Sequence, residues 1–286
     1  MSHEKTYDLT WNQYGKAEVR VVHVDRSGPQ HVVRDLNVTT GLRGDFEPAY
    51  TEGDNSRVLT TDAQKNTVFG LARETGVGEP EAFALAVARQ LLSACPSADV
   101  ARVVVEQYLW NPLSGGGGHA FSRAGSHVVV AELELNRDGA AELTGGVDEL
   151  VVLKTTDSEY SGFLKERFTT LGETDERILA TQVTARWRYA EGAAEGADHA
   201  AVKAGALEAL LGAFAGHYSL ALQQTLHAMG VAVLEACPEL AEVTLTLPNK
   251  HHFLQDLSAY GLDNPNAVYH ADDRPYGLIQ GTITRR

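Results

Sequence analysis

The sequence lacks any run of about 20 consecutive apolar residues, the length that a membrane-spanning helix needs. Its first residues, Met-Ser-His-Glu-Lys, contain no apolar signal region, and its last residues are Thr-Arg-Arg rather than a Ser-Lys-Leu peroxisomal address. These absences lead us to expect a cytoplasmic protein that has no membrane partner.

Basic residues are also scarce. The 24 Lys and Arg residues against 38 Asp and Glu residues give a net charge of −14. Nucleic-acid-binding proteins use a broad basic surface, so we expect no nucleic-acid partner. The charge balance does not argue against a small anionic ligand, because such a ligand feels only the pocket around it.

Cysteine is limited to Cys95 and Cys237, too few for a disulfide framework or a four-thiolate zinc site. We expect both thiols to be reduced, buried and structural. The eleven histidines show no HExxH or comparable spacing, and no GxGxxG motif follows a strand. Four consecutive glycines at 115–118 lack the Gly-Lys-Ser/Thr ending of a phosphate-binding loop. The sequence therefore predicts neither a metal nor a dinucleotide cofactor.

The two cysteines instead mark an internal repeat. Ala94-Cys95-Pro96 and Ala236-Cys237-Pro238 lie 142 residues apart (237 − 95), about half of the 286-residue chain. Each step ends an apolar helical stretch (80–94 and 219–235) and precedes a strand-like stretch (101–109 and 242–247). Proline restricts the residue before it and so ends the helical phase. We therefore predict two tandem domains, 8–145 and 146–286, and this length suits two medium-sized cores.

Each half also shows the same order of elements. In the first half, strand patterns at 17–24 and 31–42 flank the turn-rich segment Asp25–Pro29. In the second half, apolar residues alternate over 183–189, and 190–202 is a connector of small residues. Grouped strands with grouped helices predict an α+β fold, in which antiparallel β-sheets carry helices packed on one face.

Polar side chains follow the alternating apolar residues of 243–247. Continued in the same phase, Asn249, His251 and Phe253 fall on the apolar face, while His252 points to the opposite face. A buried amide and a buried imidazole need hydrogen-bond partners. Two interpretations remain open: structural groups bonded to nearby backbone, or a pocket wall that carries a proton-transfer histidine.

Other candidates lie far away in the sequence. Lys16 opens the first strand, where a lysine is usually a solvated charge. The segment 59–67 has the pattern of a helix N-terminus, with a threonine cap and an acidic residue in the first turn, and a helix start offers free amide N–H groups to a small anion. Arg177 shares the phase of the apolar residues that follow it, so it needs an internal carboxylate or a ligand as partner. Gln223 lies near a helix start, and a surface position without a function would explain it equally well.

Taken together, these segments resemble the cofactor-free urate oxidases (uricases). The matching segments occur in the family's order and cover nearly the whole chain: Tyr14-Gly15-Lys16, Asp54-Asn55-Ser56, Thr61-Asp62, Lys65-Asn66-Thr67, Leu153-Lys154-Thr155-Thr156, Gly162-Phe163, Thr169-Thr170-Leu171, Asp175-Glu176-Arg177-Ile178-Leu179, Leu222-Gln223 and Leu247-Pro248-Asn249-Lys250-His251.

The resemblance implies a tandem T-fold (tunnelling fold), in which four subunits form a β-barrel tunnel with active sites at the subunit interfaces. It implies that urate, dioxygen and water react to give 5-hydroxyisourate and hydrogen peroxide, with no cofactor. By position, Lys16, Thr61 and His251 look like the proton relay. Asn249, together with Thr61, looks like the holder of dioxygen or peroxide.

The same resemblance implies the substrate-binding residues. Arg177 and Gln223 look like the clamp on the purine edge, because a planar guanidinium suits paired acceptors on a flat anion. Asp62 would contribute its backbone N–H from a neighbouring subunit. Tyr160 stands where the family usually places a phenylalanine stacked on urate, and Leu222 replaces a commoner valine whose backbone contacts the substrate.

The main alternative is a zinc-dependent tunnelling-fold cyclohydrolase that acts on a pterin or purine. That chemistry needs cysteine and histidine ligands around a metal-bound water. Both cysteines occupy equivalent steps of the repeat, which favours a structural role. A non-enzymatic scaffold or binder would predict disrupted relay positions, and Lys16, Thr61 and His251 are all present.

Overall fold

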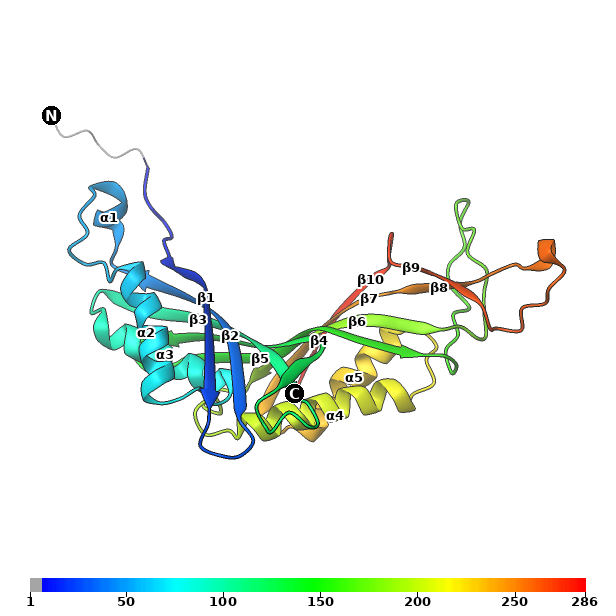
Figure 1. Ribbon diagram of the computed structural model, residues 1–286. Coiled ribbons are helices and arrows are strands. Elements are labelled where there is room, and N and C mark those ends of the chain that lie inside the picture. Colours follow the sequence, from blue (N-terminus) through cyan, green and yellow to red (C-terminus); the bar gives the residue numbers. More distant parts are fainter. Residues whose placement is uncertain (1–6) are drawn as a thin grey trace. The chain divides into compact units, whose positions relative to one another are not determined.

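The computed structural model describes residues 7–286 (Figure 1). The chain divides into two compact units, one formed by the residues up to Gly145 with Glu191–His199, the other by Gly146–Ala190 with Ala200–Arg286. The chain passes from the first unit to the second within strand β5 (Ala141–Lys154). The assignment of 8–145 and 146–286 as T-fold repeats stays a prediction.

The first unit is an antiparallel sheet with helices on one face. Its strands β1 (Tyr14–Asp25), β2 (Val32–Gly44), β3 (Ala98–Pro112) and β4 (Phe121–Asn136) lie in the order β1-β2-β3-β4. Helix α1 (Glu47–Thr51) is short; α2 (Thr61–Glu74) contacts β1, and α3 (Pro80–Ala94) contacts β3 and β4. In β3 every second residue from Ala101 to Gln107 is buried, including Val103 and Val105, while Arg102 on the alternate face pairs with Glu132.

The second unit repeats this plan. The part of β5 from Gly146, β6 (Leu179–Tyr189), β7 (Leu240–Pro248) and β10 (Leu278–Thr284) lie in the order β5-β6-β7-β10. Helix α4 (His199–Gly216) precedes α5 (Leu222–Ala236), which contacts β7 and β10. Strands β8 (His251–Leu254) and β9 (Tyr269–Asp272) form a separate hairpin, with the 3-10 turn Ser258–Tyr260 between them. The predicted α+β class, with antiparallel strands and helices on one face, is confirmed.

The two Ala-Cys-Pro steps have the same local structure. Cys95 and Cys237 are the C-caps of α3 and α5, with φ −123° at both and ψ 87° and 91°. Both thiols are free and buried, as predicted. Beyond each step, an arginine that the sequence analysis did not single out reaches back. Arg137 donates to the carbonyls of residues 92, 95 and 98, and Arg285 to those of residues 234, 237 and 240. These carbonyls lie at or just beyond helix C-termini, where backbone acceptors lack helical partners.

Helix α5 lies very close to β10 because each element has a glycine that faces a large side chain of the other. A Cβ on Gly230 would come within 2.5 Å of Ile283 Cδ1, and a Cβ on Gly281 would come within 2.9 Å of Leu226 Cδ2. The missing methyl groups therefore set how closely the helix approaches the sheet.

The strand predicted to run through 243–253 is interrupted. β7 ends at Pro248, which has no N–H for the ladder, and the next two amides bond outward, from Asn249 to Gly277 O (2.8 Å) and from Lys250 to Ala180 O (2.9 Å). The chain then leaves the sheet and forms β8. The prediction that Asn249, His251 and Phe253 continue the buried face of β7 is therefore wrong, and Phe253 is 47% exposed. None of the helices formed by residues 7–286 is long and apolar enough to cross a membrane.

Candidate active site

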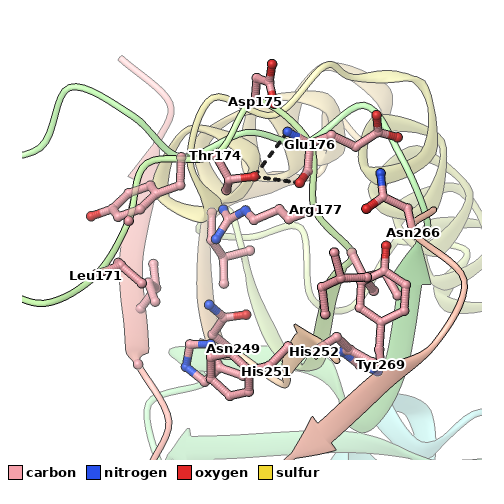
Figure 2. A pocket seen from close by; sticks show the side chains of 18 of the residues that line it. Leu171, Thr174, Asp175, Glu176, Arg177, Asn249, His251, His252, Asn266 and Tyr269 are labelled. Atoms are coloured by element: carbon pink, nitrogen blue, oxygen red, sulfur yellow. Dashed lines mark hydrogen bonds between the residues drawn. The ribbon is translucent and has the colours of Figure 1, made fainter. Parts of the chain in front are cut away.

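The second unit contains a cavity of about 660 Å³ (Figure 2). Its walls come from the segment before β6, the start of α5, the turn after β7, and the β8–β9 hairpin. Six of the nine predicted site residues line it: Tyr160, Arg177, Leu222, Gln223, Asn249 and His251. The chain thus gathers residues that are up to 91 positions apart (251 − 160) around one space.

Arg177 is half-buried in this wall, just ahead of β6 rather than within it. Its Nε donates to Ser158 Oγ at 3.2 Å, and its backbone N–H donates to Ser158 O at 2.9 Å. Burial lowers the pKa of Arg177 from its ordinary value. Within residues 7–286 no carboxylate pairs with Arg177 and no acceptor bonds its Nη atoms. The internal ion pair that the sequence left open is therefore absent from the described chain, and the outer edge of the guanidinium is available to a ligand.

Tyr160 supplies an aromatic ring beside this cation. Its backbone forms a two-bond bridge with Thr174, with N–H···O distances of 2.8 and 3.1 Å. Phe163 stacks on its ring, with centroids 5.0 Å apart and planes 15° apart, and Arg177 Cζ lies 5.2 Å from the ring centroid. No role was predicted for Phe163, although Gly162-Phe163 is among the segments that carry the resemblance. A flat ligand thus meets a backed aromatic ring and a cation together.

Asn249 and His251 line the cavity from the turn after β7 and the start of β8, so they are pocket residues rather than core residues (Figure 2). The His251 ring stacks on Phe253, with centroids 5.6 Å apart. Burial, and then the charge of Arg177, lower the pKa of His251 below its ordinary value of 6.5. His252 was expected to face away, yet it also lines the cavity, with Nδ1 3.0 Å from Lys250 O. A neutral imidazole at His251 is suited to accept a proton.

Leu222 and Gln223 are the first two residues of α5. The helix cap, Ala221, has no side-chain acceptor for the first amides of the helix. Leu222 is buried, and Gln223 is exposed on the cavity wall rather than on an open surface. The helix start therefore brings an amide side chain and a backbone segment to the cavity, and their role as a clamp stays a prediction.

Lys16, Thr61 and Asp62 belong to the first unit. Lys16 lies opposite Thr40 in the β1–β2 ladder, just before a β-bulge in which Glu18 has φ 56°. Thr61 opens α2 and Asp62 follows it, after a Thr60 cap whose Oγ1 accepts from Ala63 N at 3.1 Å, as predicted. The meeting of these three residues with the cavity of the second unit stays a prediction.

The buried side chains of Thr40 and Gln64 connect β1, which carries Lys16, to α2, which carries Thr61 and Asp62. Thr40 Oγ1 donates to Gln64 Oε1 at 2.8 Å, and it accepts from Lys16 N at 3.3 Å. Gln64 lies one turn beyond Thr61 and is fully buried. The Asp62 carboxylate accepts from Lys65 and from Asn66, and Lys65 holds the pKa of this carboxyl below its usual range.

The family model described as Uricase matches residues 12–134 and 143–280. A uricase of Arthrobacter globiformis is 49% identical over 277 residues, which cover 97% of this chain and 90% of that protein, and a uricase of Oryctolagus cuniculus is 36% identical, with 96% and 93% covered. The crystal structure of the Arthrobacter globiformis uricase superposes with a TM-score of 0.93 at 48% identity, with 98% and 96% covered. Nothing in these matches supports the zinc cyclohydrolase. The chain belongs to the uricase family.

Proposed function

We propose that this uricase oxidises urate without a cofactor, and that the purine binds in the cavity of the second unit. Urate oxidation is the activity of the family to which the chain belongs. In this reaction urate, dioxygen and water give 5-hydroxyisourate and hydrogen peroxide. Urate loses two electrons to dioxygen, water supplies the hydroxyl group, and the protons released complete the peroxide.

The observation that carries the proposal is the free Nη edge of Arg177 beside the Tyr160 ring. Urate is a flat anion whose edge presents neighbouring acceptors, and a guanidinium binds such pairs through parallel N–H groups. Gln223 then grips the same ligand from the start of α5, and the aromatic face of Tyr160 stacks on the ring. Charge, shape and hydrogen bonding all select a planar oxypurine.

The remaining residues move protons and hold oxygen. Lys16 and Thr61 remove the second proton of urate, which makes electron donation to dioxygen easier. His251, neutral near pH 7, exchanges protons with water, and Asn249 with Thr61 holds dioxygen above the ring. The protein's contribution is orientation, proton transfer and neutralisation of developing charge.

This assignment needs an assembly of subunits. We propose a homotetramer of two tandem T-fold repeats per chain, 8–145 and 146–286, that closes a β-barrel tunnel. Active sites at the subunit interfaces then join Lys16, Thr61 and the Asp62 N–H to the cavity. Sedimentation of the purified protein tests this, since the tetramer has four times the 30.9 kDa of the chain. We place the enzyme in the cytoplasm, which cell fractionation tests.

The decisive experiment follows urate absorbance and peroxide release in chelator-treated protein. We expect equal amounts of urate consumed and peroxide formed, with full activity after metal removal. Lys16→Met and Thr61→Ala should each lower kcat strongly while the thermal midpoint changes little. Normal turnover in both variants would exclude the relay, and activity that returns only with added zinc would exclude the cofactor-free reaction.

A further inference from the structure

We propose that Ser158 is a positioning residue that turns the Nη1–Nη2 edge of Arg177 toward the purine. This inference rests on the proposed function, because it assigns a partner to the arginine of the clamp. Ser158 does not line the cavity, so it acts through Arg177 and not on urate itself.

Ser158 holds Arg177 at two points. Its side-chain oxygen accepts from Arg177 Nε at 3.2 Å, and its carbonyl accepts from the Arg177 backbone N–H at 2.9 Å. Ser158 is 0% exposed, so water does not compete for the hydroxyl. The preceding residue, Asp157, has φ 56°, a left-handed conformation that non-glycine residues rarely adopt. The chain is therefore turned sharply at the point where it presents Ser158 to the arginine.

The choice of nitrogen determines how Arg177 binds. A guanidinium has five N–H groups in one plane, and it grips paired acceptors either through Nε with one Nη or through both Nη atoms. Because Ser158 occupies Nε, the edge formed by Nε and one Nη is closed to the ligand, and the edge formed by Nη1 and Nη2 remains. Within the described chain no acceptor bonds Nη1 or Nη2. The purine therefore meets one defined edge of the cation, with its orientation fixed before binding.

The other arm of the clamp depends on the same segment but not on the Ser158 hydroxyl. Glu159 N donates to Ser219 O, and Ser219 N donates to Asp157 O, both at 2.9 Å. Ser219 also accepts from Thr225 Oγ1 at 2.7 Å, inside the first turns of α5, which carries Gln223. These bonds are made by backbone atoms and by other side chains. A Ser158→Ala change therefore removes the acceptor for Nε and leaves the Gln223 arm in place.

The test is a double-mutant cycle with Ser158→Ala and Arg177→Gln. We expect Ser158→Ala to raise KM for urate about tenfold, which equals ~1.4 kcal/mol of binding free energy, with a much smaller change in kcat. In the Arg177→Gln background, Ser158→Ala should raise KM no further, because the serine acts through the arginine. Ser158→Thr, which keeps the acceptor oxygen, should restore KM.

Ser161→Ala is the matched control. This serine lies three residues along the same segment, is exposed, and bonds Glu159 Oε1 at 3.2 Å outside the cavity, so we expect wild-type kinetics. If Ser158→Ala does not fold, Ser158→Cys takes its place, since a thiol has similar size and is a weak acceptor. The inference is overturned if Ser158→Ala, or Ser158→Cys in its place, behaves like Ser161→Ala, or if its effect on KM persists without Arg177. An unchanged KM in Arg177→Gln would instead refute the proposed clamp, and this inference with it.

Discussion

The two arginines that close the C-termini of α3 and α5 should contribute equally to the stability of their units. Arg137 reaches three carbonyl oxygens, with Nε 2.7 Å from Ala98 O and Nη2 2.8 Å from Cys95 O and 3.1 Å from Leu92 O. A hydrogen bond from a charged donor contributes up to ~3 kcal/mol, but Arg137 is exposed and water replaces part of it. At ~1 kcal/mol for each carbonyl, Arg137→Ala should lower the free energy of unfolding by ~3 kcal/mol.

That loss corresponds to a drop in the thermal midpoint of roughly 6–12 °C for a domain of this size. Arg285→Ala should have the same effect, because Arg285 reaches the equivalent carbonyls. Calorimetry at fixed protein concentration measures both, with the exposed residues Arg26 and Arg286 changed to alanine as controls. If either variant melts with its control, the arginine does not stabilise the helix end, and the equivalence of the two halves is refuted at this position.

Three further predictions concern the site. The Tyr160 hydroxyl has no hydrogen-bond partner within residues 7–286, so Tyr160→Phe should change kcat/KM by less than about twofold. Tyr160→Ala loses the stacking ring and should raise KM by the equivalent of ~0.5–1.5 kcal/mol; equal kinetics for both variants would argue against stacking. Because the pKa of His251 lies below 6.5, the acid limb of kcat/KM should lie below that value and move upward when Arg177 is changed to glutamine; an acid limb that does not move would assign it to another group. The folded protein should also lose stability as the pH falls below 6.5, because the unfolded chain takes up the proton first. Thr40→Val leaves the buried Gln64 Oε1 without its donor and should lower the free energy of unfolding, measured by chemical denaturation, by ~1–3 kcal/mol. A smaller decrease than in the control Thr51→Val, at an exposed threonine, would show that the Thr40–Gln64 hydrogen bond is dispensable.

Local patterns were sufficient to predict most of the regular structure. The predicted strand 17–24 lies within β1, the predicted strand 31–42 begins one residue before β2, and the helix at 80–94 coincides with α3. These elements have continuous apolar periodicity and end at proline or at a turn, so their local preferences agree with their tertiary contacts. The Thr60 cap belongs to the same group, since a cap is a contact between near neighbours in the sequence.

The predictions that were wrong or missing depend on contacts between distant residues. Strand periodicity carried Asn249 and His251 onto the buried face, because the sequence does not show that Gly277 and Ala180 take the amides after Pro248. The partner of Arg177 could not be predicted for the same reason, because Ser158 lies 19 residues away and nothing in the sequence around it marks it as a partner. Six of the residues that line the cavity were named through the resemblance, whereas the phase of Asn249 and His251 in the strand pointed to the core.

Gly230 shows how such contacts restrict engineering of this enzyme. A glycine in the middle of a helix usually invites replacement by alanine, which gains ~1 kcal/mol of helix propensity. Here the added methyl would come within 2.5 Å of Ile283 Cδ1, so either the Ile283 side chain or α5 itself would have to shift. Since α5 carries Gln223 at its first turn, a shift of the helix caused by a change made for heat resistance would also move a side chain that lines the cavity. Stabilising libraries should therefore leave this position alone and begin on the solvent side of α4.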